Sequence, residues 1–209
     1  MPSQVKEYEK PNQDRPLPRG RPRSFDKSET LEKAMHVFWR DGYGDASLAD
    51  LCSATDLTKP SLYAAYGNKE VLFLTALDRY MDYCIRPAIE TLSSSDTARD
   101  GIRALLRDTV HALTDPETPL GCMIANSMGY AALDDTPAPV SAAILAASKE
   151  TPNAIRARLI AANVKGDIDA KVTYFETLIA GLSTLARQGM TRDTLQKVVD
   201  TAFIGWPDG

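Results

Sequence analysis

Apolar positions recur at helical spacing from residue 25 onward. Within residues 31–38 they fall three or four positions apart, so they define one face of a first helix. Asp26 stands where a helix cap belongs, and Glu29 follows three positions later, as in a capping box. Gly42 and Gly44 come next, and glycine favours the end of a helix. The pattern therefore predicts one helix that begins after Asp26 and ends near Gly42.

Two shorter helices follow the first one. Ser47 can cap a helix with a brief apolar face, and residues 54–57 form a tight turn after it. Thr58 can cap a second helix over residues 59–66, and Pro60 lies in its first turn, where a missing N–H costs little. Two short helices joined by a tight turn indicate a helix-turn-helix motif.

The rest of the chain also follows a helical period, and no alternation of apolar and polar residues is long enough to form a sheet. Pro87 and Pro152 fall inside expected helices, where we expect them to bend or end the helix. The sequence thus predicts an all-α protein of about nine helices. The six later helices are expected over residues 69–92, 97–114, 122–133, 138–163, 168–188 and 191–205.

Composition narrows the class of protein. Hydrophobic residues make up 44% and charged residues 25%, which permits a packed core in a water-soluble chain. No apolar run suits a membrane span or a signal peptide, so we expect a cytoplasmic protein without a membrane partner. The three cysteines and two histidines show no metal-ligand spacing, and no nucleophile–base pair or phosphate-binding loop is visible. We therefore expect no enzyme, no metal and no cofactor.

The charge is unevenly distributed. The net charge is −4, yet basic residues gather in and just after a proline-rich segment, residues 1–23, which we expect to be a disordered arm. Its core, from Arg19 through Arg21 to Arg23, resembles an AT-hook, a peptide that lies in the narrow minor groove of A·T-rich DNA. The alternative is a flexible basic tail that adds only salt-dependent affinity for DNA.

The second short helix suits the major groove of DNA. Thr58, Lys59 and Ser61 are small or polar residues near its N-terminus, where a recognition helix contacts base edges. Leu62 can anchor its inner side. Free N–H groups at a helix N-terminus favour a phosphate, and Ser47 could bind one in the same way at the preceding helix.

Residues 42–51 and 57–72 strongly resemble the DNA-binding domain of the TetR family, and the match runs from about residue 25 to 80. Residues 175–206 resemble the dimerising end of one TetR subgroup. The resemblance implies a nine-helix dimer, a variable ligand pocket in the C-terminal domain, and repression that a ligand relieves. The specific signature is Leu62-Tyr63 followed by Tyr66, Lys69 and Glu70.

The resemblance also assigns parts of the chain. It implies a helix-turn-helix domain over residues 24–70, and a regulatory and dimerisation domain over residues 71–209. Tyr63 and Tyr66 would place hydroxyls on phosphates, although both could instead be aromatic packing at the helix end. The expected contacts with double-stranded operator DNA come from Thr58, Lys59, Ser61, Tyr63, Tyr66 and Lys69.

Dimerisation is expected through the last two long helices, because their apolar positions are too many for packing on one side only. A four-helix bundle between two copies would cover these positions. The interface residues that we expect are Phe175, Leu178, Leu182, Leu185, Val198 and Phe203.

The inducer is expected to be a small molecule in a pocket with apolar walls, although each candidate residue taken singly is more often plain core. Cys122 stands at an expected helix start, which favours a reactive thiolate, so an oxidant or electrophile sensor is the alternative. An architectural AT-hook protein is a further alternative, but it would not need a long helical C-terminal domain. The candidate pocket residues are Tyr83, His111, Cys122, Met123, Met128, Tyr130 and Phe175.

Overall fold

The computed structural model describes residues 26–204 and Trp206 of the chain. These residues form helices and connecting turns, and no strand occurs among them. The all-α fold predicted from the apolar periodicity is therefore confirmed. The first three helices are α1 (Lys27–Asp45), α2 (Leu48–Thr55) and α3 (Lys59–Tyr66).

Side-chain caps start the first two helices. The Asp26 carboxylate accepts hydrogen bonds from two backbone N–H groups in the first turn of α1. Glu29 forms an ion pair with Lys33 one turn further on. The reciprocal exchange of a capping box occurs at α2, where the side chains of Ser47 and Asp50 each accept from the other's backbone N–H. Local hydrogen bonds thus fix both helix starts.

The first helix is broken near its end, as the glycines predict. Gly42 has φ 75° and ψ −179°, a backbone conformation that L-residues with a side chain rarely adopt. Gly42 is buried, and a Cβ atom at this position would lie 2.5 Å from the ring of Tyr130. The glycine therefore allows both the turn and a close approach of a later helix.

A single continuous rod carries the chain out of the first three helices. It consists of α4 (Lys69–Tyr80), the π-helical turn η1 (Met81–Ile85) and α5 (Arg86–Ser94). Pro87 lies in the first turn of α5 and does not end the rod. The turn before it is wider than an α-helical turn, and in it the Arg86 N–H donates to the Met81 carbonyl, five residues back. This π-helical turn accommodates the proline. Counted this way, the described residues form nine helical rods, in agreement with the expectation.

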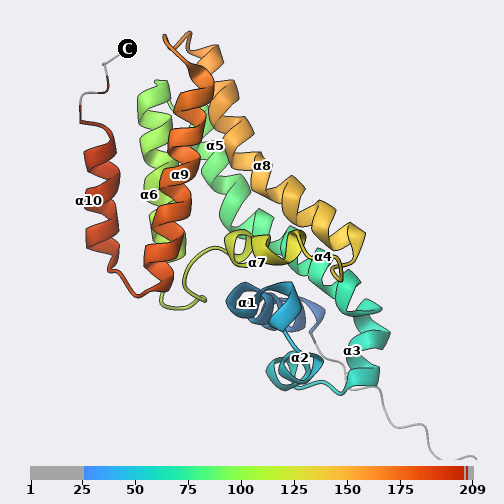
Figure 1. Cartoon of the computed structure of the whole chain (residues 1–209). Coiled ribbons are helices and arrows are strands. Elements are labelled where there is room, and N and C mark those ends of the chain that lie inside the picture. The colour runs from blue at the N-terminus through green and yellow to red at the C-terminus, as the bar shows by residue number, and fades with distance from the viewer. Residues whose placement is uncertain (1–25, 205, 207–209) are drawn as a thin grey trace, which may run out of the picture.

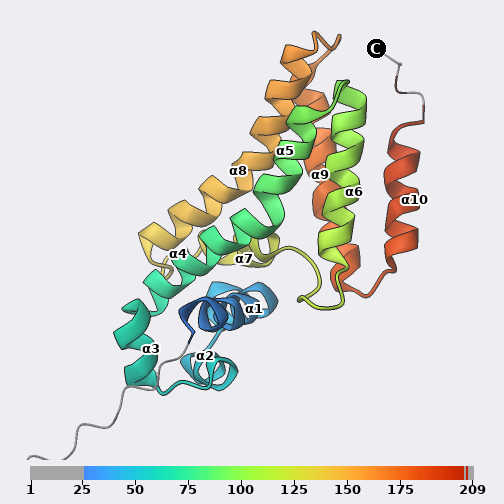
Figure 2. The same ribbon diagram turned by 180° about the vertical axis from the view of Figure 1, so that it is seen from behind.

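The remaining helices begin and end within a few residues of the expected positions. Pro152 lies inside α8, which continues through it. In Figures 1 and 2, α1, α2 and α3 gather at one end, the long later helices extend away from them, and α7 lies between the two groups. These helices are α6 (Ala98–Leu113), α7 (Met123–Ala131), α8 (Ala138–Ala161), α9 (Ile168–Arg187) and α10 (Arg192–Ala202).

Two apolar clusters form the core. One lies around Phe38, Trp39 and Phe73, and it also includes Met123 from α7 and Ile144 from α8. The other joins α5, α6, α8, α9 and α10, with Phe175 and Phe203 among its fully buried members. The first cluster crosses the expected domain boundary at residue 70, so α7 and the start of α8 share a core with the helix-turn-helix.

Candidate DNA-binding surface and regulatory cleft

The N-terminal half of α3 presents its polar side chains to solvent. Leu62 is fully buried and anchors the helix, whereas Thr58, Lys59 and Ser61 are exposed. The hydroxyls of Thr58 and Ser61 lie 2.9 Å apart and can share a hydrogen bond. The Lys59 ammonium lies 5.6 Å from the centre of the Tyr63 ring. These side chains form one exposed polar surface at the helix start, as a recognition helix requires.

Tyr66 and Lys69 have partners within the protein that sequence reasoning missed. The Tyr66 hydroxyl donates a 2.6 Å hydrogen bond to the Lys27 carbonyl at the start of α1. The Lys69 ammonium donates to the Gly44 carbonyl at 3.3 Å and lies 4.7 Å from the centre of the Tyr43 ring. Partial burial lowers the pKa of Lys69. Both side chains therefore hold α3 and α4 against the two ends of α1.

Ser47 lies exposed at the start of α2, where its hydroxyl is hydrogen-bonded to the Asp50 carboxylate. These contacts lower the pKa of Asp50, so the carboxylate stays charged beside the hydroxyl. The predicted arm residues Arg19, Arg21 and Arg23 lie outside the described residues.

A cleft of about 200 Å³ opens between η1, α7, α8 and α9. Two of the predicted pocket residues line it, Cys122 and Met128. Its walls are mostly apolar, as expected for a small-molecule site. The lining residues are Ile85, Cys122, Ile124, Ala125, Met128, Ala147, Ser148, Thr151, Pro152, Glu176, Ile179, Ala180 and Ser183.

The other predicted pocket residues lie elsewhere. The Tyr83 side chain points into solvent and is 59% exposed, and the exposed His111 ring contacts Arg192. Met123 and Phe175 are fully buried, one in each apolar cluster, which corresponds to the alternative of plain core. The last one, Tyr130, packs on α1. Helical periodicity could not separate these positions from the cleft, because it gives the buried face but not the neighbouring helix.

Hydrogen bonds connect the cleft to α1. At the N-cap of α7, the Cys122 N–H donates to the Ser183 hydroxyl of α9 at 3.1 Å. The adjacent Gly121 carbonyl accepts a buried 2.8 Å hydrogen bond from the Trp39 indole. One turn into α7, the Asn126 amide donates to the Trp39 carbonyl at 2.7 Å. The α7 helix therefore contacts both the cleft and the centre of α1.

Two of the three cysteines lie beside this connection. The buried Tyr80 hydroxyl donates to the Cys122 sulfur at 3.3 Å, and the Tyr80 ring packs edge-on against Trp39. Burial, with a contribution from the nearby Cys122, raises the pKa of Cys84 to about 12. Cys84 is therefore a weak nucleophile near neutral pH, because the thiolate is the reactive form. The third cysteine, Cys52, is half-buried against the first apolar cluster.

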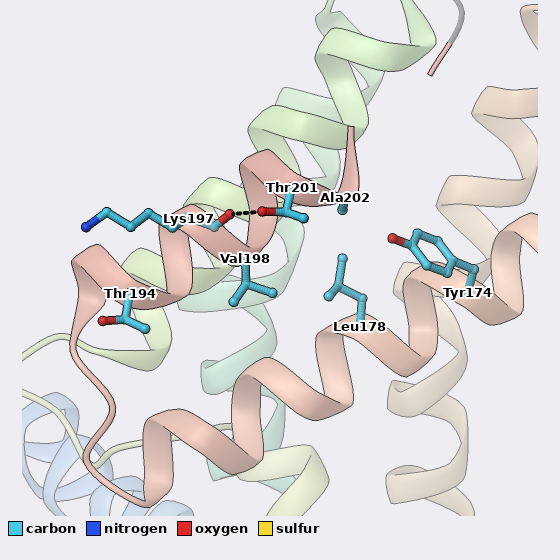
Figure 3. Close-up of a pocket in the computed structure, with 7 residues that line it drawn as sticks. All are labelled: Tyr174, Leu178, Thr194, Lys197, Val198, Thr201 and Ala202. Carbon is cyan, nitrogen blue, oxygen red and sulfur yellow. Dashed lines mark hydrogen bonds between the residues drawn. The ribbon is translucent and has the colours of Figure 1, made fainter. Parts of the chain in front are cut away.

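The last two helices leave an apolar groove open on their outer side. In Figure 3, Leu178 of α9 and Val198 of α10 point toward one another across it, and Tyr174 stands at one end. Tyr174 is 49% exposed, and Leu178, Leu185 and Val198 are half-buried. The other residues predicted for the dimer interface, Phe175, Leu182 and Phe203, are buried inside the protomer. Fewer of the predicted interface residues therefore reach the surface than the apolar pattern of the sequence suggested.

Comparison with known proteins places this arrangement among regulators. Residues 31–76 match the family model "Bacterial regulatory proteins, tetR family". The uncharacterized HTH-type transcriptional regulator YezE of Bacillus subtilis (strain 168) is 31% identical over 193 residues, which is 88% of this chain and 97% of that protein. The HTH-type transcriptional repressor ComR of Escherichia coli (strain K12) is 28% identical over 197 residues, or 91% and 93% of the two chains.

A solved structure extends the similarity to nearly the whole fold. It is a cysteine mutant of the TetR family transcriptional regulator CifR, complexed with 26-bp double-strand operator DNA. The two folds superpose with a TM-score of 0.80 at 37% sequence identity, over 90% of this chain and 100% of that one. No helix in residues 26–204 combines the length and apolar character that crossing a bilayer requires.

Proposed function

This chain belongs to the TetR family of bacterial regulatory proteins, and from that premise we propose that it is a transcriptional repressor that binds operator DNA in the cytoplasm. The observation that carries the proposal is the exposed polar start of α3, with Thr58, Lys59 and Ser61 around the buried anchor Leu62. This is the part of a helix-turn-helix that enters the major groove. Operator-bound CifR, which shares the fold, supports the same use of the domain here.

A gel-shift titration on the DNA upstream of the gene tests this proposal. Lys59→Ala should weaken binding about tenfold, within the cost of a lost base or phosphate contact. Lys165→Ala, an exposed lysine between α8 and α9, is the matched control and should bind like the wild type. Equal binding by both variants would remove α3 from the interface.

We further propose that the repressor is a homodimer through the groove between α9 and α10. The exposed Tyr174 and the half-buried Leu178 and Val198 line an apolar groove that favours a partner surface, and a second copy presents the same groove with two-fold symmetry. Leu178→Glu should give a monomer in light scattering at micromolar concentration. Asp108→Lys, on the exposed side of α6, should leave the dimer intact. A wild-type monomer would contradict the proposal directly.

Release from the operator is proposed to follow the binding of a small molecule in the cleft. The hydrogen bonds of α7 support this coupling, because an occupant beside Cys122 and Ser183 would lie one residue from the Gly121 carbonyl that holds Trp39. A ligand shifts this equilibrium only as far as it prefers the released form. The affinity for operator DNA, measured with and without a ligand in the cleft, reports how strongly that ligand prefers the released form.

A thiol sensor is the second candidate, and the position of Cys122 on the cleft wall supports it. Iodoacetamide should then modify Cys122 well before Cys84, whose pKa of about 12 keeps it protonated. Alkylation should release the operator from the wild type and not from Cys122→Ser. Release from both, or from neither, would leave the non-covalent ligand as the only candidate.

A further inference from the structure

Two of the α8 residues that line the cleft are Ser148 and Pro152, and the proline changes the helical hydrogen bonding beside them. Pro152 lies inside this helix and has no N–H, so it cannot donate the helical hydrogen bond that the Ser148 carbonyl would otherwise receive. Both Ser148 and Pro152 line the cleft. The proline thus removes the usual helical donor to the Ser148 carbonyl, at a residue that lines the cleft.

The side chains add acceptors of the same kind. The Ser148 hydroxyl donates its proton to the Leu145 carbonyl at 2.9 Å, which leaves its oxygen lone pairs for another donor. Glu176, an exposed residue of α9, also lines the cleft and carries a carboxylate. Glu176 is the only charged residue among the described residues that line this cleft, and no lysine, arginine or histidine occurs in that set.

Most of the remaining lining is apolar, apart from the Cys122 thiol and the hydroxyls of Thr151 and Ser183. Ile85 of η1, Ile124 and Met128 of α7, and Ile179 of α9 enclose the volume of about 200 Å³. A site of this size excludes a large ligand. An anionic group would meet the Glu176 carboxylate with no cation among the lining residues, which is unfavourable at a partly buried site.

From this lining we propose that the cleft binds a compact, largely apolar molecule that carries a protonated amine or a similar cationic hydrogen-bond donor. The cation pairs with Glu176 and donates to the acceptors around Ser148, while the apolar body packs between η1, α7 and α9. The inference deepens the proposed release mechanism and rests on it only for the effect on DNA. Binding itself is a separate property of the cleft.

Three probes of similar size and different charge test the ligand class: benzylamine, benzyl alcohol and benzoate. With the full-length protein in isothermal titration calorimetry, benzylamine should bind about tenfold more tightly than benzyl alcohol, the usual effect of a charge-assisted hydrogen bond in a partly exposed site. Benzoate should bind more weakly than both. Equal affinities for the amine and benzoate, or no binding by any probe, would overturn the proposal.

Two variants and one control test which residues cause the preference for the amine. Glu176→Gln should remove the preference for the amine over the alcohol, whereas Glu150→Gln, an exposed glutamate of α8 that does not line the cleft, should keep it. Pro152→Ala restores a backbone donor to the Ser148 carbonyl and should weaken amine binding by a smaller factor without unfolding the helix. A preference that survives Glu176→Gln would contradict the assigned role of the carboxylate.

The operator readout separates the two proposals. If benzylamine binds with the expected preference and also releases operator DNA in a gel shift, both are supported. If it binds with that preference and leaves the operator complex unchanged, the ligand class stands and the release mechanism fails. If the wild type does not bind its upstream DNA at all, the proposed repressor function fails while the calorimetric result still decides the ligand class.

Discussion

Tyr66 ends the recognition helix, and its hydroxyl donates to the Lys27 carbonyl at the start of α1. Tyr63, one turn earlier, is half-buried, and no hydrogen bond from its hydroxyl occurs within the described residues. The family resemblance treats the two tyrosines alike, as hydroxyl donors to phosphate. The structure gives them different surroundings, so they can be separated experimentally.

Tyr66→Phe should lower the free energy of unfolding by about 1 kcal/mol, the net contribution of a typical hydrogen bond. Tyr63→Phe should leave stability unchanged and weaken operator binding, because its hydroxyl is free to reach a phosphate. Urea denaturation and gel-shift titration measure the two effects on the same samples. If Tyr66→Phe is as stable as the wild type and binds DNA less tightly, its hydroxyl contacts the operator instead.

Sequence reasoning could find the exposed residues of α3 because amphipathic spacing decides which side of a short helix faces solvent. It could not find the partners of Tyr66 and Lys69, since their acceptors stand 39 and 25 residues away in the chain. The same limit applies to the Pro152 site. The proline is visible in the sequence, but only the packing of α8 against α7 and α9 shows that Ser148 and Pro152 line a cleft.

At the scale of elements, the contact between α7 and α1 is the least predictable part of the fold. The apolar pattern predicted a helix over residues 122–133, and the structure has α7 at Met123–Ala131. A helical period indicates a buried face but not its partner. Here the Tyr130 ring covers Gly42 and Gly44, so closely that a Cβ atom at Gly44 would lie 2.2 Å from it.

Gly44→Ala should therefore destabilise the protein by about 1–3 kcal/mol, the usual cost of overpacking. Gly44 does not have a positive φ, so the backbone accepts alanine and the effect comes from the ring. Tyr130→Ala should relieve the cost in the double variant, which thermal unfolding can show as a non-additive cycle. Gly129→Ala on α7 is the control, because nothing lies within 4 Å of a Cβ there, and it should be neutral or slightly stabilising.

At the scale of the whole molecule, the basic residues are unevenly distributed along the chain. The net charge is −4, yet the residues before α1 are rich in arginine. Deletion of residues 1–23 should leave folding intact, because the Asp26 cap that starts α1 remains. It should weaken DNA binding at low salt, since the lost arginines no longer displace counterions from the phosphates.

The base composition of the operator flanks then decides how the arm works. If Arg19 and Arg21 enter the minor groove, deletion should cost more affinity on A·T-rich flanks, which offer a narrow and strongly negative groove, than on G·C-rich flanks. Two operators with the same half-sites and different flanks, titrated at one salt concentration, make the comparison. An equal loss on both would leave the arm as a sequence-independent tether.

The shared apolar cluster of α1, α4, α7 and the start of α8 has a consequence for protein engineering. Regulators of this kind can be combined into chimeras, in which one parent protein supplies the operator specificity and the other supplies the response to a chemical. A junction near residue 70 would cut through this cluster and set α1 of one parent against a foreign α7, with mismatched surfaces at Trp39 and Tyr130. A working biosensor built from this chain would have to transplant residues 122–147 together with the DNA-reading helices.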